Sequence, residues 1–371
     1  MLLKSLEIHC FRNLKGHVDW GNNLNIIWGE NGQGKTNWLE SIYLLATSKS
    51  FRTQRLQEAI KFNESLSVIS GVVTRSHEVS RELQVVIQGN TKSLLVNSKR
   101  ESLSQYLGQL HTIAFTASDL EIVRGTPEAR RKFLDRGIIS LHPSYLQTLA
   151  NFHRVIKQKN RLLQAVGNAE LPMNSIMLKL EPWNEQLIAL SAEIFNSRSE
   201  YVDRLGKSLK LNLFSNDELS IHYVSSLEGK GDISNYKSLL AERLHIRIQA
   251  EVSAGYALIG PHRDELKIMF NGRDVRMFGS SGQQRSALIL LDLAAISVYH
   301  TWHGEYPLFL MDDADAELDR KHISSLIDYL QGGVQTFVTT SKDNLIKDYQ
   351  SQADIYEVIE GKINNISSLN R

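Results

Sequence analysis

The sequence predicts an α/β protein in which a helical segment is inserted between two stretches of mixed strand and helix pattern. An apolar run at residues 24–28 leads through a glycine-rich loop into a helix pattern. From Pro127 to about Asn212 the pattern is helical, with few glycines or prolines, and strands return in the final third. We therefore expect a lobe with a mixed sheet and helices, built from residues 1–115 and 250–371, and a helical arm lobe at residues 116–249.

The glycine-rich loop fits the phosphate-binding pattern G-x-x-x-x-G-K-[ST]. Its glycines let backbone N–H groups curl around a phosphate, and the following helix adds partial positive charge. Lys35 is expected to bridge the outer phosphates, and the Thr36 hydroxyl to ligate Mg²⁺. The alternative is a glycine-rich turn with a solvated lysine. The residues expected to bind nucleotide are Gly29, Glu30, Asn31, Gly32, Gln33, Gly34, Lys35 and Thr36.

Composition indicates a folded cytosolic protein. Of the 371 residues, 42% are hydrophobic and 22% charged, and no uninterrupted apolar run reaches the roughly 18 residues of a membrane helix. The single cysteine, Cys10, excludes an internal disulfide and a cysteine-based metal cluster, and is expected to be a packing residue. The formal net charge of +1 requires any DNA contact to use a local patch or a surface completed by a second subunit.

The first hundred residues show strand patterns around the loop. Leu6, Ile8 and Cys10 alternate on one face of a strand, and Arg12 follows it. Arg12 lies near the nucleotide if this strand neighbours the one that enters the loop; otherwise it is a surface arginine. Strand patterns at 67–75, 81–88 and 93–96, separated by turn residues, predict an antiparallel region attached to the nucleotide core.

The helical segment predicts a hairpin of two long helices, Pro143–Val166 and Pro182–Lys210. The second would span roughly 43 Å, enough for an arm but not for an extended coiled coil. Three consecutive bases near the start of the segment are either a solvated face or a nucleic-acid contact, and the first long helix mixes aromatic and basic residues that either pack or bind nucleic acid. These residues are Arg130, Arg131 and Lys132, and Phe152, Arg154, Lys157, Lys159 and Arg161.

A second anion cradle is predicted where small residues open a helix at Ser286–Tyr299. Its residues are Ser280, Gly282 and Gln283. Two arrangements are open: Ser280 caps its own helix, or the cradle faces a γ-phosphate held by Lys35 of a second subunit.

An apolar strand at Leu308–Met311 ends in two acids. Asp312 is assigned to hold Mg²⁺ with Thr36, and Asp313 to position or deprotonate the attacking water, although its side chain is one methylene shorter than glutamate. The catalytic residues are therefore expected to be Lys35, Asp312 and Asp313. Together with the phosphate loop and the Ser-x-Gly-Gln cradle, they describe an ABC-type ATPase head.

The chain resembles the RecF family of bacterial DNA recombination and repair ATPases over essentially its full length. The resemblance implies an SMC-like head without the long coiled coil, ATP-dependent homodimerisation, binding to double-stranded DNA or gap junctions, slow ATP hydrolysis, and cooperation with RecR and RecO in loading RecA. The matching residues are Phe11-Arg12-Asn13, Gly29–Thr36, Asp119-Leu120, Gly125-Thr126-Pro127, Arg130-Arg131-Lys132-Phe133-Leu134-Asp135, Gly260-Pro261-His262-Arg263-Asp264, Ser280 with Gly282-Gln283-Gln284-Arg285, and Asp312-Asp313.

Some positions depart from the family pattern. Leu14 stands where tyrosine is usual, and Ala117 replaces a proline. Ala316 replaces the serine of the usual Ser-Glu-Leu-Asp loop, which puts the signalling role of residues 316–319 in doubt while leaving nucleotide binding intact.

Two rival functions share these motifs. An ABC transporter ATPase subunit would pack them into about one domain, whereas here a β region and a long helical insertion separate Thr36 from Ser280. A non-catalytic scaffold, whose nucleotide only sets its shape, would differ in having no DNA-stimulated turnover.

Overall fold

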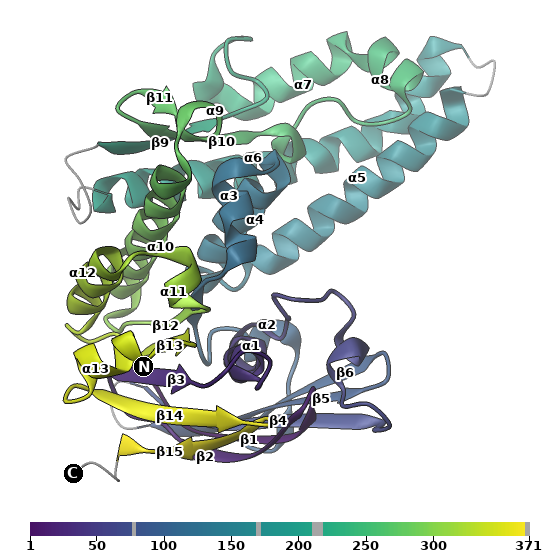
Figure 1. Ribbon diagram of the computed structural model, residues 1–371. Helices are drawn as coiled ribbons and strands as arrows, with labels where there is room; N and C mark the ends of the chain where they lie inside the picture. The colour runs from purple at the N-terminus through teal and green to yellow at the C-terminus, as the bar shows by residue number, and fades with distance from the viewer. Residues whose placement is uncertain (76–78, 168–171, 210–217, 368–371) are drawn as a thin grey trace. The chain divides into compact units, whose positions relative to one another are not determined.

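The chain folds into two compact units (Figure 1). The computed structural model describes residues 1–75, 79–167, 172–209 and 218–367. The first unit is built mainly from Met1–Leu120 and Ser280–Arg371, and the second from Glu121–Lys207 and Leu219–Gly279.

An antiparallel sheet forms one layer of the first unit, with strand order β2-β1-β4-β5-β6-β7 (Figure 1). Alternate residues are buried along β4 and β5, as expected for a sheet with one face on the core. The strands predicted at 67–75, 81–88 and 93–96 are confirmed. The strand bounds are β1 Leu2–Phe11, β2 Leu14–Asp19, β4 Leu66–Thr74, β5 Ser80–Gln88, β6 Thr91–Val96 and β7 Lys99–Arg100.

A second, mainly parallel sheet has the order β15-β14-β3-β13-β12-β8. Every residue of β12 and β13 is buried, as expected for strands covered on both faces; β12 is apolar throughout, whereas β13 buries three threonines beside Phe337 and Val338. Because the carboxyl ends of parallel strands meet at one edge, the loop after β3 and the acids after β12 come to the same edge. The bounds are β3 Leu24–Trp28, β8 Thr112–Phe115, β12 Leu308–Met311, β13 Thr336–Thr340, β14 Ala353–Ile359 and β15 Lys362–Asn365, which is antiparallel to β14.

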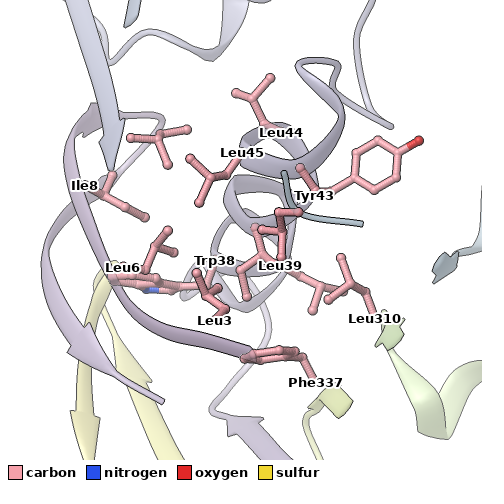
Figure 2. Close-up of a cluster of buried hydrophobic side chains, with 14 of the residues drawn as sticks. Leu3, Leu6, Ile8, Trp38, Leu39, Tyr43, Leu44, Leu45, Leu310 and Phe337 are labelled. Carbon is pink, nitrogen blue, oxygen red and sulfur yellow. The ribbon is translucent and has the colours of Figure 1, made fainter. Parts of the chain in front are cut away.

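Helix α1, Lys35–Thr47, contacts strands of both sheets and joins their cores. Figure 2 shows Trp38 and Leu39 of this helix among side chains from β1, β12 and β13. Trp20 packs edge-on against Trp38, Phe337 and Tyr356, with ring centroids 6.4, 5.1 and 4.6 Å apart. A single apolar core therefore supports the segment that follows the phosphate loop.

Further helices complete the first unit. Helix α10, which contacts β8, begins earlier and ends later than the predicted Ser286–Tyr299 helix. The bounds are η1 Leu56–Ala59, α2 Leu103–Tyr106, η2 Ala117–Leu120, α10 Ser281–His303, α11 Ala314–Glu317, α12 Arg320–Leu330 and α13 Asp343–Tyr349.

The second unit is mainly helical. Its long helix α6 was expected to start at Pro182, but it starts at Met173 and contains Pro182. The proline removes one backbone hydrogen bond, yet Ile176 and Leu180 before it pack with Leu163 and Val166 of α5, which holds the additional turns. The bounds are α3 Glu121–Arg124, α4 Pro127–Leu141, α5 Tyr145–Gly167, α6 Met173–Ser208, α7 Tyr236–Ile246, α8 Ile248–Ala254 and α9 Val275–Phe278.

A small antiparallel sheet of order β11-β10-β9 also belongs to this second unit. Asn271–Gly272, the dipeptide most typical of a two-residue hairpin turn, joins β10 to β11. The ATPase lobe was expected to resume at residue 250. Residues 250–279 instead belong to the second unit, because β10 pairs with β9 and α8 contacts α5. The bounds are β9 Leu219–Val224, η3 Ile233–Asn235, η4 Pro261–Arg263, β10 Glu265–Phe270 and β11 Arg273–Asp274.

Candidate nucleotide site

The loop Gly29–Thr36 joins β3 to α1, in the strand–loop–helix setting that the phosphate-binding pattern needs. Gly29 has φ +155°, and a Cβ there would lie 2.5 Å from the Val358 carbonyl oxygen. Gly34 has φ +112° and directly precedes the helix. A Cβ on Gly32 would meet no atom within 4 Å, so the loop is open on the side of Gly32 where a side chain would project.

Lys35 is only 8% exposed, and its ammonium group lies against the loop. Nζ donates to the carbonyl oxygens of Gly29 at 2.8 Å and Glu30 at 2.9 Å. Burial lowers the Lys35 pKa, and the charges of Asp313 and Asp312 oppose that shift. The loop therefore curls around a cation at its centre.

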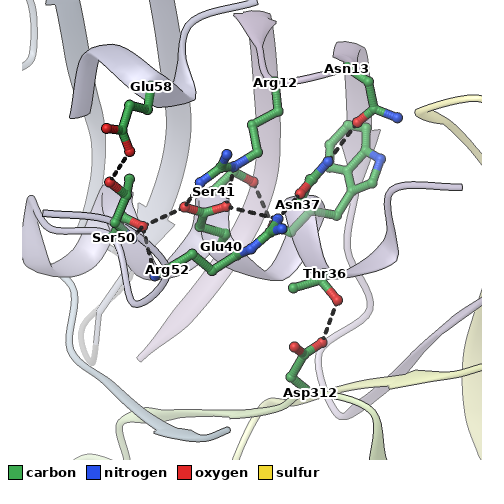
Figure 3. A network of polar contacts seen from close by, with 12 residues as sticks. Arg12, Asn13, Thr36, Asn37, Glu40, Ser41, Ser50, Arg52, Glu58 and Asp312 are labelled. Carbon is green, nitrogen blue, oxygen red and sulfur yellow. Dashed lines mark hydrogen bonds and ion pairs between the residues drawn. The ribbon is translucent and has the colours of Figure 1, made fainter. Parts of the chain in front are cut away.

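Thr36 and Asp312 meet at the edge of the parallel sheet, as the sequence predicts for a magnesium site. The Thr36 hydroxyl donates to Asp312 Oδ1 at 2.9 Å (Figure 3). The Thr339 hydroxyl donates to the same oxygen at 2.8 Å. Burial raises the Asp312 pKa, while these two hydroxyl contacts lower it. Hydroxyl and carboxylate oxygens are the ligands that Mg²⁺ prefers, so these residues fit the ion.

Asp313 follows in a left-handed conformation, with φ 49° and ψ 56°. Aspartate tolerates this region better than most residues. Its backbone N–H donates to the Thr339 hydroxyl at 2.7 Å, while its side chain is exposed. One threonine thus fixes both acids, and the second carboxylate remains accessible to solvent.

Arg12 forms a bidentate pair with Glu40 of α1, at 2.5 and 2.7 Å (Figure 3). Glu40 is fully buried and also accepts from the Ser50 hydroxyl at 2.5 Å. Arg52 Nη1 lies 3.7 Å from the same carboxylate. The observed role of Arg12 is therefore to neutralise a buried acid one helical turn beyond Thr36.

Ser280 caps helix α10 in a reciprocal capping box. Its hydroxyl accepts from the Gln283 N–H at 3.2 Å, and the Gln283 side chain accepts from the Ser280 N–H at 3.0 Å. Within the described ranges, no hydrogen bond joins this cradle to the phosphate loop. A Cβ on Gly282 would meet nothing closer than 3.9 Å, so packing within this subunit does not require glycine there.

The bases predicted as a solvated face or a nucleic-acid contact have mixed environments. Arg130 is 3% exposed and pairs with Glu265 at 2.6 and 2.8 Å, so it fits neither alternative. Arg131 donates to the Asp264 carbonyl oxygen at 2.7 Å. Lys132 is 65% exposed and pairs with Glu128.

The aromatic and basic stripe on α5 also contributes buried residues. Phe152 and Lys159 are both buried, and Lys159 Nζ lies 2.7 Å from a Glu251 carboxylate oxygen. Packing therefore accounts for these two positions, and neither is available for nucleic acid.

Two residues of the candidate site were not predicted from the sequence. Thr339 holds both acids, and its position at the end of a strand next to the acidic strand was the available signal. Glu40 is a single acid in an otherwise largely apolar helix, which was the available signal. Its partner Arg12 lies 28 positions away, so the sequence did not reveal the pair.

The parallel sheet, the phosphate loop and the acidic strand end define an ATPase head of the ABC and SMC type. Residues 2–364 match the family model described as the RecF/RecN/SMC N terminal domain. The chain belongs to the RecF family of DNA replication and repair proteins. It is 34% identical to RecF of Oceanobacillus iheyensis and 36% identical to RecF of Staphylococcus aureus, in each case over 98% of this chain and all of the relative.

Solved structures agree with this assignment. The recombination mediator protein RecF-ATPrS matches with a TM-score of 0.89 and 28% identity, over 98% of both chains. The RecF-ATP structure gives 0.86 and 29%, over 98% of this chain and 97% of the other. An SMC head from Pyrococcus yayanosii, at 14% identity and a TM-score of 0.57, covering 98% of this chain and 96% of the other, shares the fold. These motifs therefore belong to a RecF-family protein and not to the ATPase subunit of an ABC transporter.

None of the described helices combines the length and the apolar character needed to cross a bilayer.

Proposed function

We propose that the chain binds ATP at Gly29–Thr36 with Mg²⁺ and hydrolyses it slowly. The observation that carries the proposal is the 2.9 Å contact between the Thr36 hydroxyl and Asp312, beside the ammonium group of Lys35. The loop N–H groups and Lys35 bind the phosphates, and Thr36 and Asp312 hold the metal. The ion, when bound, neutralises charge on the phosphates.

Hydrolysis is assigned to the exposed carboxylate of Asp313. Its backbone is fixed by Thr339, which restricts where the side chain can reach. From there it orients the attacking water or accepts its proton. Asp313 is shorter than glutamate, which supports slow turnover. Stimulation of that turnover by DNA is proposed from the family.

ATP-dependent dimerisation is proposed for the capped end of α10. Glycine in a helix costs roughly 1 kcal/mol relative to alanine, and no neighbour within the subunit demands it at Gly282. A requirement from outside the subunit supports the arrangement in which Ser280, Gly282 and Gln283 face a γ-phosphate held by Lys35 of a second copy. ADP lacks that phosphate, so only ATP favours the dimer.

The proposed cellular role follows from the family. The ATP-bound relatives are described as recombination mediators in the RecFOR pathway. We extend to this chain binding of double-stranded and gapped DNA, cooperation with RecR and RecO, assistance in loading RecA, and a cytoplasmic location. The formal net charge is only +1, so one copy can offer DNA phosphates only local patches of basic residues. A dimer would align two copies of each patch.

Sedimentation of the pure protein with ATP, with ADP and without nucleotide tests this proposal. We expect dimers with ATP and Mg²⁺ only. Lys35→Ala should remain monomeric and bind ATP poorly, because it removes the ammonium charge that lies against the loop. Equal sedimentation in all three conditions would refute ATP-dependent dimerisation, and undiminished ATP affinity of Lys35→Ala would refute the site.

A further inference from the structure

The turn between β14 and β15 is bonded to the middle of the phosphate loop. The backbone N–H of Glu360 donates to Gln33 Oε1 at 2.7 Å, and that of Gly361 donates to the Gln33 carbonyl oxygen at 2.8 Å. The Gly361 carbonyl oxygen accepts from the Trp38 indole N–H at 3.1 Å. Both the loop and the first turn of α1 are therefore held by the same two residues.

The strand that carries this turn is also tied to the entrance of the loop. Strand β14 pairs in parallel with β3, placing Glu357 opposite Trp28. The next residue, Val358, directs its carbonyl oxygen at Gly29, so closely that a Cβ there would lie 2.5 Å away. The hairpin thus contacts the loop at its entrance, its centre and its exit.

The geometry of the turn is costly. Glu360 has φ 48° and Gly361 has φ 81°, the pair of positive values that a type I′ hairpin turn requires. Glutamate is not a residue that this turn favours, and a non-glycine residue at positive φ is uncommon. A Cβ on Gly361 would lie 2.3 Å from the Asn13 carbonyl oxygen. Strained backbone conformations are concentrated at functional sites, and this turn contacts the candidate phosphate loop.

We propose that this hairpin turn holds the phosphate loop in its binding shape before nucleotide arrives, with Gln33 as the positioning residue that connects them. The inference rests on the proposed function of the loop. A loop with glycines at 29, 32 and 34 has much backbone freedom to lose when it orders around phosphates. Contacts that order it in advance remove that cost from binding and so raise affinity.

The test compares Gly361→Ala with Gly272→Ala. Gly272 lies in the β10–β11 turn with φ 74°, after Asn271 with φ 47°, so both substitutions carry the same kind of backbone strain. A Cβ on Gly272 meets nothing within 4 Å, whereas one on Gly361 pushes on Asn13. Hydrogen exchange of the peptide spanning residues 29–36 is measured without nucleotide, and ATP affinity by equilibrium titration.

In Gly361→Ala we expect faster exchange in that peptide and a Kd for ATP about three- to tenfold higher, the range for one lost hydrogen bond. Gly272→Ala should leave both readouts at wild-type values. Gln33→Met, which keeps the chain length but removes the acceptor oxygen, should reproduce the faster exchange without altering the turn.

Wild-type exchange and affinity in both Gly361→Ala and Gln33→Met would overturn the inference. If Gly361→Ala fails to fold, Gln33→Met alone decides, because it changes a partly exposed side chain. If the wild-type protein itself binds no ATP, the proposed function fails, while the exchange comparison still reports whether the turn orders the loop.

Discussion

The Thr36 hydroxyl donates to the Asp312 carboxylate over 2.9 Å, although 276 positions separate the two residues in the chain. The contact joins the helix that leaves the phosphate loop to the strand that ends in acids. Each residue supplies an oxygen, so the pair can act as one metal site.

Thr36→Val keeps the branched shape but removes the hydroxyl. We expect the Mg²⁺ concentration needed for half-maximal ATP binding to rise by at least about tenfold, an effect typical of losing a group that supports a metal site. Titration of Mg²⁺ at fixed ATP measures it. Thr47→Val at the far end of the same helix, where the hydroxyl donates to the Tyr43 carbonyl oxygen, is the matched control. An unchanged midpoint in Thr36→Val would remove Thr36 from the metal site.

Asp313→Asn should bind ATP normally but hydrolyse it on the order of a hundredfold more slowly, the effect of losing one preorganised catalytic group. Asparagine accepts the left-handed backbone at this position, so folding should be preserved. Single-turnover hydrolysis provides the measurement, with the exposed Asp328→Asn as control. Wild-type turnover in Asp313→Asn would place the base elsewhere.

Ser280→Arg should bind ATP as a monomer but fail to dimerise with ATP or retain DNA, because the large side chain fills the cradle. Ser280→Ala leaves the cradle open and removes only the hydroxyl, whose loss as a helix cap costs about 1 kcal/mol of stability. Sedimentation with ATP should therefore show weaker dimerisation in Ser280→Ala and none in Ser280→Arg. If both variants dimerise like the wild-type protein, the serine only caps its helix. Dimerisation of Ser280→Arg at the wild-type level would rule out the two-subunit arrangement.

Arg130→Gln should destabilise the protein by about 2 kcal/mol, since Glu265 loses its bidentate partner. This is less than the roughly 3–5 kcal/mol typical of a fully buried pair, because Glu265 remains 24% exposed. Lys132→Gln, at an exposed pair, should change stability by no more than about 0.5 kcal/mol. Urea unfolding compares the two. Lost DNA binding with unchanged stability in Arg130→Gln would contradict the structural role.

Burial lowers the His262 pKa from 6.5 to about 4. The folded state therefore resists a proton that the unfolded state accepts, and stability falls as pH drops from about 6.5 to 4. Because each pH unit between the two pKa values is worth about 1.4 kcal/mol, the complete loss corresponds to roughly 3.5 kcal/mol. Urea midpoints at pH 7.5, 6 and 4.5 should fall less steeply in His262→Gln. Parallel profiles for the two proteins would show that His262 does not titrate in this range.

Sequence reasoning succeeded where the signal was local. The phosphate loop and the alternating strands depend on neighbouring residues, and the structure has both of them. The meeting of Thr36 with Asp312 also followed, because parallel strands end at a common edge.

It failed where a residue's environment depends on distant partners. Arg130 was expected on a solvated face or at nucleic acid, but it is buried and pairs with an acid 135 positions away. For Lys159 the sequence left packing and nucleic-acid binding open, and only its pairing with an acid 92 positions away shows that it is buried. Pro182 indicates a helix start by its own chemistry, and only packing against α5 shows that the helix continues through it. The Gln33 contact with the β14–β15 turn spans 327 positions and has no local signature.

Strand β3, at the centre of the parallel sheet, has implications for biosynthesis. Both its neighbours, β13 and β14, come from residues beyond 335, and Asn25 donates to the Thr336 carbonyl oxygen 311 positions later. At about 5–20 residues per second, a ribosome needs on the order of 15–60 s to cover that span. Throughout that interval the apolar β3 segment of the nascent chain has no sheet partner and is open to aggregation. A polypeptide released before residue 336 can contain the entire phosphate loop and still lack both strands that flank β3.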